Sequence, residues 1–255
     1  MTDTFLDDDV LDSFSIDDFL AQRPYPWWNL AQVLRPEAFE RLCAAFPARS
    51  LFEWHEPERS YGQRPHNRYY LAYQSDQYAA YDGLPKSAFP EAWQEFFTEL
   101  ETSPVYNRFI RTCLGRSELN VRYTFHLGVN GSEVSPHRDK GRKVGTHIFY
   151  FNTRDDWDPA WGGATLVLDG RQTDRLDPDF ADFASATSVE NLGNRSFLFK
   201  NTDDAWHGMP PLTCPEGFYR RIFNVIFERS DEPTRQRAST LERVKRRAKA
   251  MVPLR

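Results

Sequence analysis

A histidine and an aspartate stand two residues apart in "SPHRDKG" (135–141), directly after a segment that alternates like a β-strand. On an extended chain, side chains two residues apart point to the same side, so His137 and Asp139 can bind one ion together. An imidazole and a carboxylate suit a borderline divalent metal such as Fe(II). Taken alone, the pair is weak evidence for a metal site, and a solvated surface turn is the simpler interpretation.

A third ligand is needed, and the six histidines of the chain can be weighed in turn. His126 and His147 fall inside expected strands, where a histidine is more often a hydrogen-bonded interior residue. His207 follows the expected strand "RSFLFK" and precedes a Pro-rich loop. A barrel can bring the ends of such strands together, so His207 is the predicted third ligand. Two histidines and one carboxylate leave three metal positions open, as in non-haem iron(II) oxygenases.

Two adjacent arginines begin the last expected strand, "YRRIFNVIFE" (219–228). Neighbouring residues of a strand point to opposite faces, so only one of Arg220 and Arg221 faces inward. A buried arginine needs a carboxylate partner, and an exogenous dicarboxylate beside the metal would provide one through a bidentate contact. The alternative is two surface arginines at the edge of a barrel.

The elements that must position these residues change in character along the chain. The first half favours helices over 35–47 and from Pro90 onward, each with one apolar stripe, and a third helix over 104–114. The second half alternates with a period of two, and strands are predicted over 120–129, 145–152, 162–169, 195–200 and 219–228. We therefore expect an α+β protein with an antiparallel jelly-roll core, N-terminal helices packed on it and a C-terminal helix.

Composition divides the chain into four parts. Residues 1–20 contain seven Asp and no Lys or Arg and are expected to be a flexible acidic lead-in. Residues 21–117 form a helical and loop region, in which the aromatic- and Arg-rich segment 62–70 is either a substrate lid or a packed polar loop. Residues 118–228 are the predicted core. Residues 229–255, with nine Lys or Arg against three acids, are predicted to be a basic C-terminal region whose helix spans 239–252.

Overall composition limits the classes of function. The net charge of −5 argues against a dedicated nucleic-acid binder. No apolar run approaches the ~20 residues needed to span a membrane, and the acidic start does not fit a secretory signal. Three cysteines, odd in number and far apart, exclude a disulfide framework and suit a reducing cytoplasm. These features predict a cytoplasmic protein and leave its oligomeric state open.

Four motifs in the right order and spacing resemble the iron(II)/2-oxoglutarate-dependent dioxygenases, in the branch of the prolyl 4-hydroxylases. The motifs are "HRD" (137–139), "HIFYFNTRDDWDPAWGGATLVL" (147–168), "RSFLFKNTDDAWHG" (195–208) and "RRIFNVIF" (220–227). The resemblance covers about residues 118–228 and implies the double-stranded β-helix, the jelly-roll core of that superfamily.

The chemistry of the family follows from this resemblance. His137, Asp139 and His207 would bind Fe(II) as the catalytic centre. The enzyme would consume 2-oxoglutarate and O2, release succinate and CO2, and hydroxylate an unactivated C–H bond, with ascorbate as an aid in vitro. Because halogenating members lack the carboxylate ligand, Asp139 favours hydroxylation, with desaturation or ring closure left open.

The resemblance also assigns the residues that hold 2-oxoglutarate. The basic residue for its distal carboxylate matches Arg220, because the face that Arg220 shares with Asn224 should line the barrel. Arg221 is the fallback. Tyr150 matches an inward tyrosine that hydrogen-bonds the same carboxylate in related enzymes, and Tyr123 is a second candidate.

The substrate is predicted only by class. A small molecule, such as an amino acid or a biosynthetic intermediate, is favoured because the aromatic and Arg-rich N-terminal half could enclose it. The alternative is a residue, for example a prolyl residue, in a protein or peptide. A third hypothesis is a non-catalytic cupin-like binding protein, which would keep the three ligands but have no use for an inward arginine.

Overall fold

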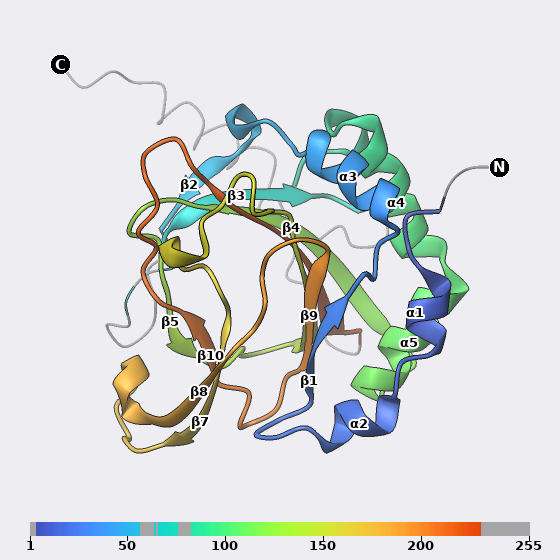
Figure 1. Cartoon of the computed structure of the whole chain (residues 1–255). Coiled ribbons are helices and arrows are strands. Elements are labelled where there is room, and N and C mark those ends of the chain that lie inside the picture. The colour runs from blue at the N-terminus through green and yellow to red at the C-terminus, as the bar shows by residue number, and fades with distance from the viewer. Residues whose placement is uncertain (1–3, 57–63, 65, 76–82, 231–255) are drawn as a thin grey trace, which may run out of the picture.

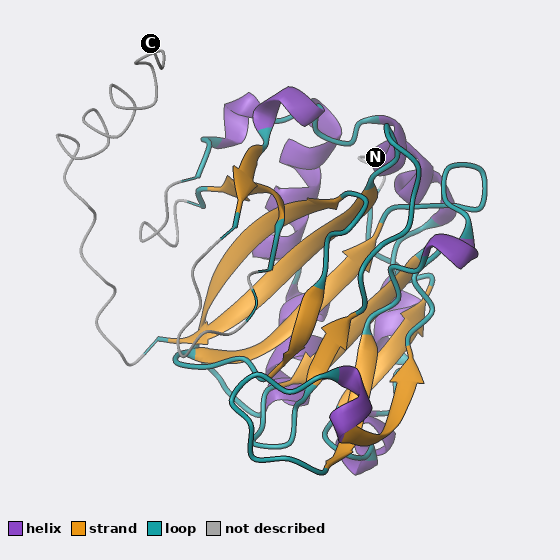
Figure 2. Cartoon of the chain, turned by 90° about the vertical axis from the view of Figure 1, so that its left-hand side faces the viewer, coloured by secondary structure: helices purple, strands orange, loops and turns teal. Residues whose placement is uncertain are grey.

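Two antiparallel β-sheets face each other (Figures 1 and 2). Side chains of both sheets line a hollow between them. The structure is a computed structural model that describes residues 4–56, 64, 66–75 and 83–230. The larger sheet has the strand order β1-β9-β6-β11-β4-β3-β2, and the smaller has the order β5-β10-β7-β8. The strands are β1 (Trp27–Ala31), β2 (Glu53–His55), β3 (Arg68–Tyr73), β4 (Leu119–Gly128), β5 (Val134–His137), β6 (Lys143–Tyr150), β7 (Leu166–Arg171), β8 (Phe183–Ser188), β9 (Arg195–Lys200), β10 (His207–Met209) and β11 (Arg220–Arg229).

Helices cover the outer face of the larger sheet (Figure 1). They are α1 (Asp8–Asp12), α2 (Ile16–Ala21), α3 (Pro36–Ala44), α4 (Glu91–Thr102) and α5 (Pro104–Leu114), with short 3₁₀ helices at Arg49–Leu51, Lys86–Ala88, Pro159–Trp161 and Phe180–Asp182. Trp93 of α4 packs edge-on against Phe125 of β4 and Phe223 of β11, at ring-centroid distances of 4.6 and 5.2 Å. The aromatic side chains that alternate along β4 and β11 therefore form the helix-facing core.

The predicted architecture is confirmed: a double-stranded β-helix carries helices from the N-terminal half of the chain. Helices α3, α4 and α5 and strands β4, β6, β7, β9 and β11 lie where the periodicity predicts them. The predicted C-terminal helix over 239–252 lies outside the described residues. In the described part, every helix is too short or too polar to cross a membrane.

The prediction that residues 1–20 form a flexible lead-in is wrong for residues 4–20, the described part of that range. This segment forms α1 and most of α2, and Phe5 and Leu6 are at most 2 % exposed in the core. The backbone N–H groups of Phe5 and Leu6 donate to the carboxylate of Glu99, at 2.7 and 2.9 Å. A few apolar residues among the aspartates are thus enough to anchor the segment, because their burial and these long-range hydrogen bonds stabilise it.

The N-terminal region also adds strands that periodicity does not predict. β1 pairs with β9, while β3 pairs with β4 and carries β2 at the sheet edge. The larger sheet therefore extends beyond the predicted core of residues 118–228 on both sides. This extension brings residues 66–68 to the rim of the hollow between the sheets.

His147 lies on the helix-facing side of β6, fully buried between two hydroxyl groups. Its Nδ1 hydrogen-bonds with the Tyr106 hydroxyl at 3.0 Å, and its Nε2 with the Ser196 hydroxyl at 2.9 Å. Burial lowers the pKa of His147 to about 3, so the folded protein keeps this imidazole neutral at mild acidity.

We expect His147 to make the fold sensitive to acid. The folded-state pKa is depressed, so its contribution is complete above pH 6.5 and is lost as the pH falls toward about 3. Between pH 7 and pH 5, the wild type should lose about 2 kcal/mol more unfolding free energy than His147→Gln. Urea unfolding at the two pH values measures the difference, and equal losses would contradict the assignment.

Candidate active site

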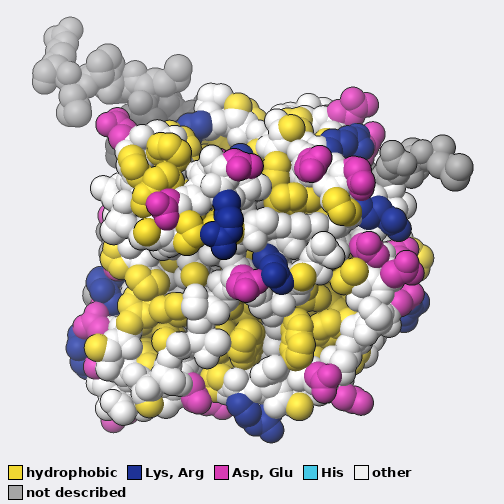
Figure 3. All heavy atoms as spheres, in the orientation of Figure 1, with side chains coloured by type: hydrophobic (Ala, Val, Ile, Leu, Met, Phe, Trp, Pro, Cys, Tyr) yellow, Lys and Arg dark blue, Asp and Glu magenta, His cyan; other side chains and the backbone are white. Residues whose placement is uncertain are grey.

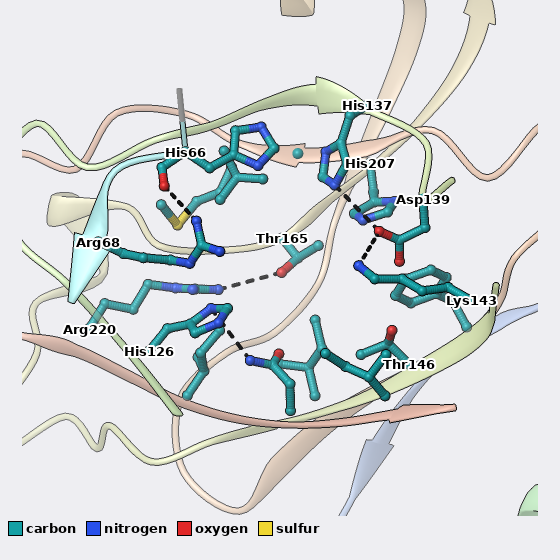
Figure 4. A pocket seen from close by; sticks show the side chains of 18 residues that line it. His66, Arg68, His126, His137, Asp139, Lys143, Thr146, Thr165, His207 and Arg220 are labelled. Atoms are coloured by element: carbon teal, nitrogen blue, oxygen red, sulfur yellow. Dashed lines mark hydrogen bonds and ion pairs between the residues drawn. The ribbon is translucent and has the colours of Figure 1, made fainter. Parts of the chain in front are cut away.

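The pairing of β5 with β10 places two histidines side by side. His207 lies directly opposite His137 in the register, and their ring centroids are 4.3 Å apart. Asp139 follows two residues later, with its Oδ1 3.9 Å from the His137 Nε2. One ligand atom from each of the three residues lies within 4.8 Å of the others, and Figure 4 shows the three side chains converging. This arrangement can hold a single metal ion.

Hydrogen bonds direct the two imidazoles toward the same point. The Nδ1 of His137 lies 3.1 Å from the Ser135 carbonyl oxygen, and the Nδ1 of His207 lies 2.9 Å from the Ala205 carbonyl oxygen. A carbonyl accepts only from a protonated nitrogen, so both rings carry the proton on Nδ1 and present the Nε2 lone pair. Such contacts fix the ring orientation of metal-binding histidines.

The electrostatics of the site suit a divalent cation. Burial raises the pKa of Asp139, but the cations of Lys143 and Arg122, with His207, outweigh this effect and hold its pKa below the usual value. The Lys143 Nζ donates to the Asp139 Oδ1 at 2.6 Å. Burial lowers the pKa of His207 more strongly than Asp139 raises it. A neutral imidazole beside an ionised carboxylate is the state that binds a metal, and this donor set fits Fe(II).

Arg220 enters the same hollow from the first position of β11. It is 6 % exposed, and its Nε donates to the Gly163 carbonyl at 2.5 Å while its Nη2 lies 3.5 Å from the Thr165 hydroxyl. Its guanidinium carbon lies 5.5 Å from the centre of the Tyr150 ring. Within the described part of the chain, no carboxylate forms an ion pair with Arg220. A buried cation that meets only neutral groups is suited to a carboxylate from outside the chain.

Gly163 permits the close approach of Arg220. Its φ of +97° is a conformation that favours glycine, and a Cβ at this position would lie 3.1 Å from the Arg220 Cδ. Gly162 ends the preceding 3₁₀ helix, with its N–H donating to the Pro159 carbonyl at 3.1 Å, and Gly163 shapes the wall around the arginine.

Residues 121–228 match the family model described as the 2OG-Fe(II) oxygenase superfamily. This match spans nearly all of the predicted core of residues 118–228, and the core is therefore similar to that superfamily. Its members use Fe(II), 2-oxoglutarate and O2, which confirms the predicted enzyme class and cofactors and sets aside the non-catalytic cupin-like alternative.

Solved structures show that the oxygenase shares its fold with enzymes of several activities. It is similar to a prolyl-4-hydroxylase from Pseudomonas putida (18 % identity, TM-score 0.58, covering 86 % of this chain and 100 % of that one). It is also similar to SnoK, a non-heme alpha ketoglutarate dependent carbocyclase from nogalamycin biosynthesis (14 % identity, TM-score 0.58, 92 % of each chain). A Trichoplax adhaerens prolyl hydroxylase in complex with a hypoxia inducible factor peptide is similar as well (10 % identity, TM-score 0.55, 87 % and 90 %). No curated protein matches the oxygenase.

The structure separates the two adjacent arginines of the oxygenase. Arg221 lies on the opposite face of β11, where it forms an ion pair with Asp156 and covers the Phe46 ring at 5.6 Å. Ile222 and Asn224 line the hollow together with Arg220. The fallback assignment of Arg221 to the co-substrate therefore does not fit its position.

The two predicted tyrosines lie in different places. The Tyr150 hydroxyl hydrogen-bonds with the Thr165 hydroxyl at 2.8 Å. Thr165 and Arg220 line the hollow, and Tyr150 supports Thr165 from outside the lining. The assignment of Tyr123 to 2-oxoglutarate is corrected by its position. Tyr123 lies on the helix-facing side of β4, and its ring is stacked parallel on the Phe223 ring at a centroid distance of 6.0 Å. Strand alternation turns Tyr123 away from the hollow, and it is a core residue of the oxygenase.

Several lining residues have only weak signals in the sequence. Lys143 and Thr165 line the hollow, but neither belongs to a sequence motif that would predict this position. The one signal for Lys143 is that it follows Asp139 by four residues. His126 lines the hollow, as its place on the polar side of β4 suggests. Arg122, on the same face of β4, forms an ion pair with Glu228 at 3.3 Å.

Proposed function

We propose that the oxygenase hydroxylates an unactivated C–H bond of a small molecule. His137, Asp139 and His207 hold Fe(II) in this proposal, and Arg220 binds the distal carboxylate of 2-oxoglutarate. The observation that carries it is one hollow lined by both the three converging ligands and a buried arginine without a carboxylate partner among the described residues. When bound, Fe(II) would activate O2 with 2-oxoglutarate as the co-substrate, and this oxidising chemistry would yield succinate, CO2 and a hydroxylated product.

The chain's own side chains prepare the site for this chemistry. Lys143 orients the Asp139 carboxylate and keeps it ionised. The Arg220 guanidinium is oriented by the Gly163 carbonyl and by the Thr165 hydroxyl, which in turn contacts Tyr150. Binding of a carboxylate therefore requires little further ordering of the Arg220 side chain. Apolar side chains of both sheets exclude water from the metal, among them Ile148, Phe199 and Met209.

Enclosure of the hollow favours a small substrate. Arg64 forms ion pairs with Asp179 at 2.9 Å and with Glu133 at 3.6 Å, on loops next to the smaller sheet. Two residues on, the His66 ring lies 4.6 Å from the His137 ring. The described part of this segment thus spans from the smaller sheet to β3 of the larger one and covers one side of the hollow, whose volume is about 140 Å³.

The proposal is tested by measuring succinate formed from 2-oxoglutarate with Fe(II), O2 and ascorbate. We expect the low-molecular-mass ultrafiltrate of a cell extract to raise succinate production several-fold, and the Asp139→Ala variant to show no response. Fractionation of the active filtrate then identifies the substrate. Stimulation by the protein retentate alone, or by proline-containing peptides, would instead support peptide hydroxylation. Failure of 2-oxoglutarate to bind would refute the assignment of the site.

A further inference from the structure

The loop between β9 and β10, residues 201–206, contacts the metal-binding segment at two places. The loop ends directly before His207, the third ligand. Its first residue is Asn201, whose side-chain amide donates to the backbone carbonyls of Asp139 and Lys143, both at 3.0 Å. The loop that leads into one ligand therefore also holds the chain around another.

Arg138, the residue between the two other ligands, makes the second contact with this loop. Its guanidinium donates to the Asp203 backbone carbonyl, and its Nη1 lies 3.3 Å from the Asp203 carboxylate. The guanidinium carbon lies 5.2 Å from the centre of the Trp206 ring, which is a cation–π contact. Arg138 and Trp206 line a second hollow, distinct from the one that the metal ligands line. The two segments that supply the ligands are thus joined again outside the active site.

An arginine–aspartate pair at the surface is common on this protein. Figure 3 shows acidic and basic side chains interspersed over the face that it draws. The Asp203 side chain is fully exposed, so its ion pair with Arg138 contributes little to stability. Arg138 is distinguished instead by its position in the chain, between His137 and Asp139. Its other partner, Trp206, directly precedes the third ligand.

Backbone pairing alone does not fix the carboxylate ligand. β5 ends at His137, and its ladder with β10 comprises two residue pairs with an irregular register between them. Asp139 lies two residues beyond the end of β5. Its place relative to the two histidines therefore depends on the side-chain contacts of the segment that follows the strand.

We propose that Arg138 is a positioning residue for the metal site. Its guanidinium ties the segment of Asp139 to the loop that leads into His207, and so sets the distance between these two ligands. Lys143 orients the Asp139 carboxylate itself, whereas Arg138 and Asn201 hold the backbone that carries it. Contacts of this kind around metal ligands tune metal affinity. This inference rests on the proposed function, because it concerns the metal centre that the function requires.

Positioning and charge predict opposite effects when Arg138 is replaced. Arg138→Gln removes a positive charge next to the ligands, and this change by itself should strengthen the binding of a divalent cation. If Arg138 holds Asp139 in place, the same variant should bind the cation more weakly. The sign of the change in affinity therefore separates the two effects.

Co(II) serves as the probe, because its visible absorption reports the geometry and kind of ligands around it. Competition with a metal-binding dye gives the affinity, and the spectrum is recorded with the site saturated. Arg138→Gln should bind Co(II) at least about tenfold more weakly than the wild type. Its saturated spectrum should shift toward that of Asp139→Ala, which lacks the carboxylate ligand. A purely structural role of Arg138 would not change the spectrum of the saturated site.

Two further variants complete the comparison. Arg138→Lys should recover part of the affinity, because an ammonium group can still donate to the Asp203 carbonyl. Arg171→Gln is the matched control, since the Arg171 guanidinium lies 4.6 Å from the centre of the same Trp206 ring but belongs to β7, which carries no ligand. We expect Arg171→Gln to match the wild type in Co(II) affinity and spectrum, and every metal-free variant to melt close to the wild type.

The possible outcomes are distinct. Unchanged or tighter Co(II) binding in Arg138→Gln would refute the positioning role while leaving the metal site, and with it the proposed function, intact. Equal weakening in Arg138→Gln and Arg171→Gln would assign the effect to the surface around Trp206 and would also overturn the inference. If the wild type itself fails to bind Co(II), the proposed function fails as well.

Discussion

Replacing His207 with Ala is expected to abolish iron retention and all 2-oxoglutarate turnover. His207 is the ligand that joins the two sequence-distant parts of the site, since β10 brings it opposite His137. Its loss leaves His137 and Asp139, which are two residues apart and supply only two of the three ligand atoms. We expect iron affinity to fall by at least about a hundredfold, beyond what loss of a supporting contact costs.

The measurement is iron content after loading with Fe(II) under anaerobic conditions and desalting. A thermal melt of the metal-free protein accompanies it, because His207 is 7 % exposed and its truncation leaves a cavity. The wild type should melt at a higher temperature when Fe(II) is added, and His207→Ala should show no such shift. A folded variant that lacks the shift isolates the loss of the metal from any loss of the fold.

His147→Gln is the matched control for this experiment. His147 is also a strand histidine of the core, but its two ring nitrogens are engaged by Tyr106 and Ser196 on the helix side of β6. Its replacement should lower stability yet leave iron content unchanged. If His147→Gln lost iron while His207→Ala retained it, the choice of third ligand would be wrong.

Long strands with one face toward the helices could be predicted from the sequence, and the short strands could not. β4 and β11 are ten residues each, with aromatic residues on one side, so their period of two is unmistakable. β5 and β10 have four and three residues, too few to show a period. Yet these two strands carry the histidines of the site. Their pairing is a long-range property, so the sequence indicates His207 only by its place after an expected strand, and not by the strand that carries it.

The errors have equally specific causes. The sequence pattern already sets Tyr123 on the apolar side of β4, and the structure shows that this side faces the helices. β3 shows no clear alternation because three consecutive residues, Leu71, Ala72 and Tyr73, are all buried. The sequence therefore does not predict that Arg68 begins a strand, because it lies in a segment rich in arginine and aromatic residues without periodicity. The register between strands determines which side chains meet across them, and local composition does not predict that register.

Arg220→Ala is expected to abolish 2-oxoglutarate binding while preserving the fold and the metal. A bidentate, charge-assisted contact in a buried site is worth several kcal/mol, so affinity should fall by about a hundredfold or more. Burial opposes the charge of this guanidinium, and lowers its pKa, because its protein partners are the neutral groups of Gly163 and Thr165. Removing it therefore relieves a desolvation cost, and the metal-free protein should not melt earlier.

Arg221→Ala supplies the control from the very next residue. This change deletes an ion pair with Asp156 that is partly exposed to solvent, so it should cost at most about 1 kcal/mol of stability. Titration calorimetry of the Mn(II)-loaded proteins with 2-oxoglutarate compares the two variants directly. Because neighbouring residues of β11 point to opposite faces, the two results must differ. Normal 2-oxoglutarate binding in Arg220→Ala, with loss in Arg221→Ala, would mean that the strand presents its other face to the co-substrate.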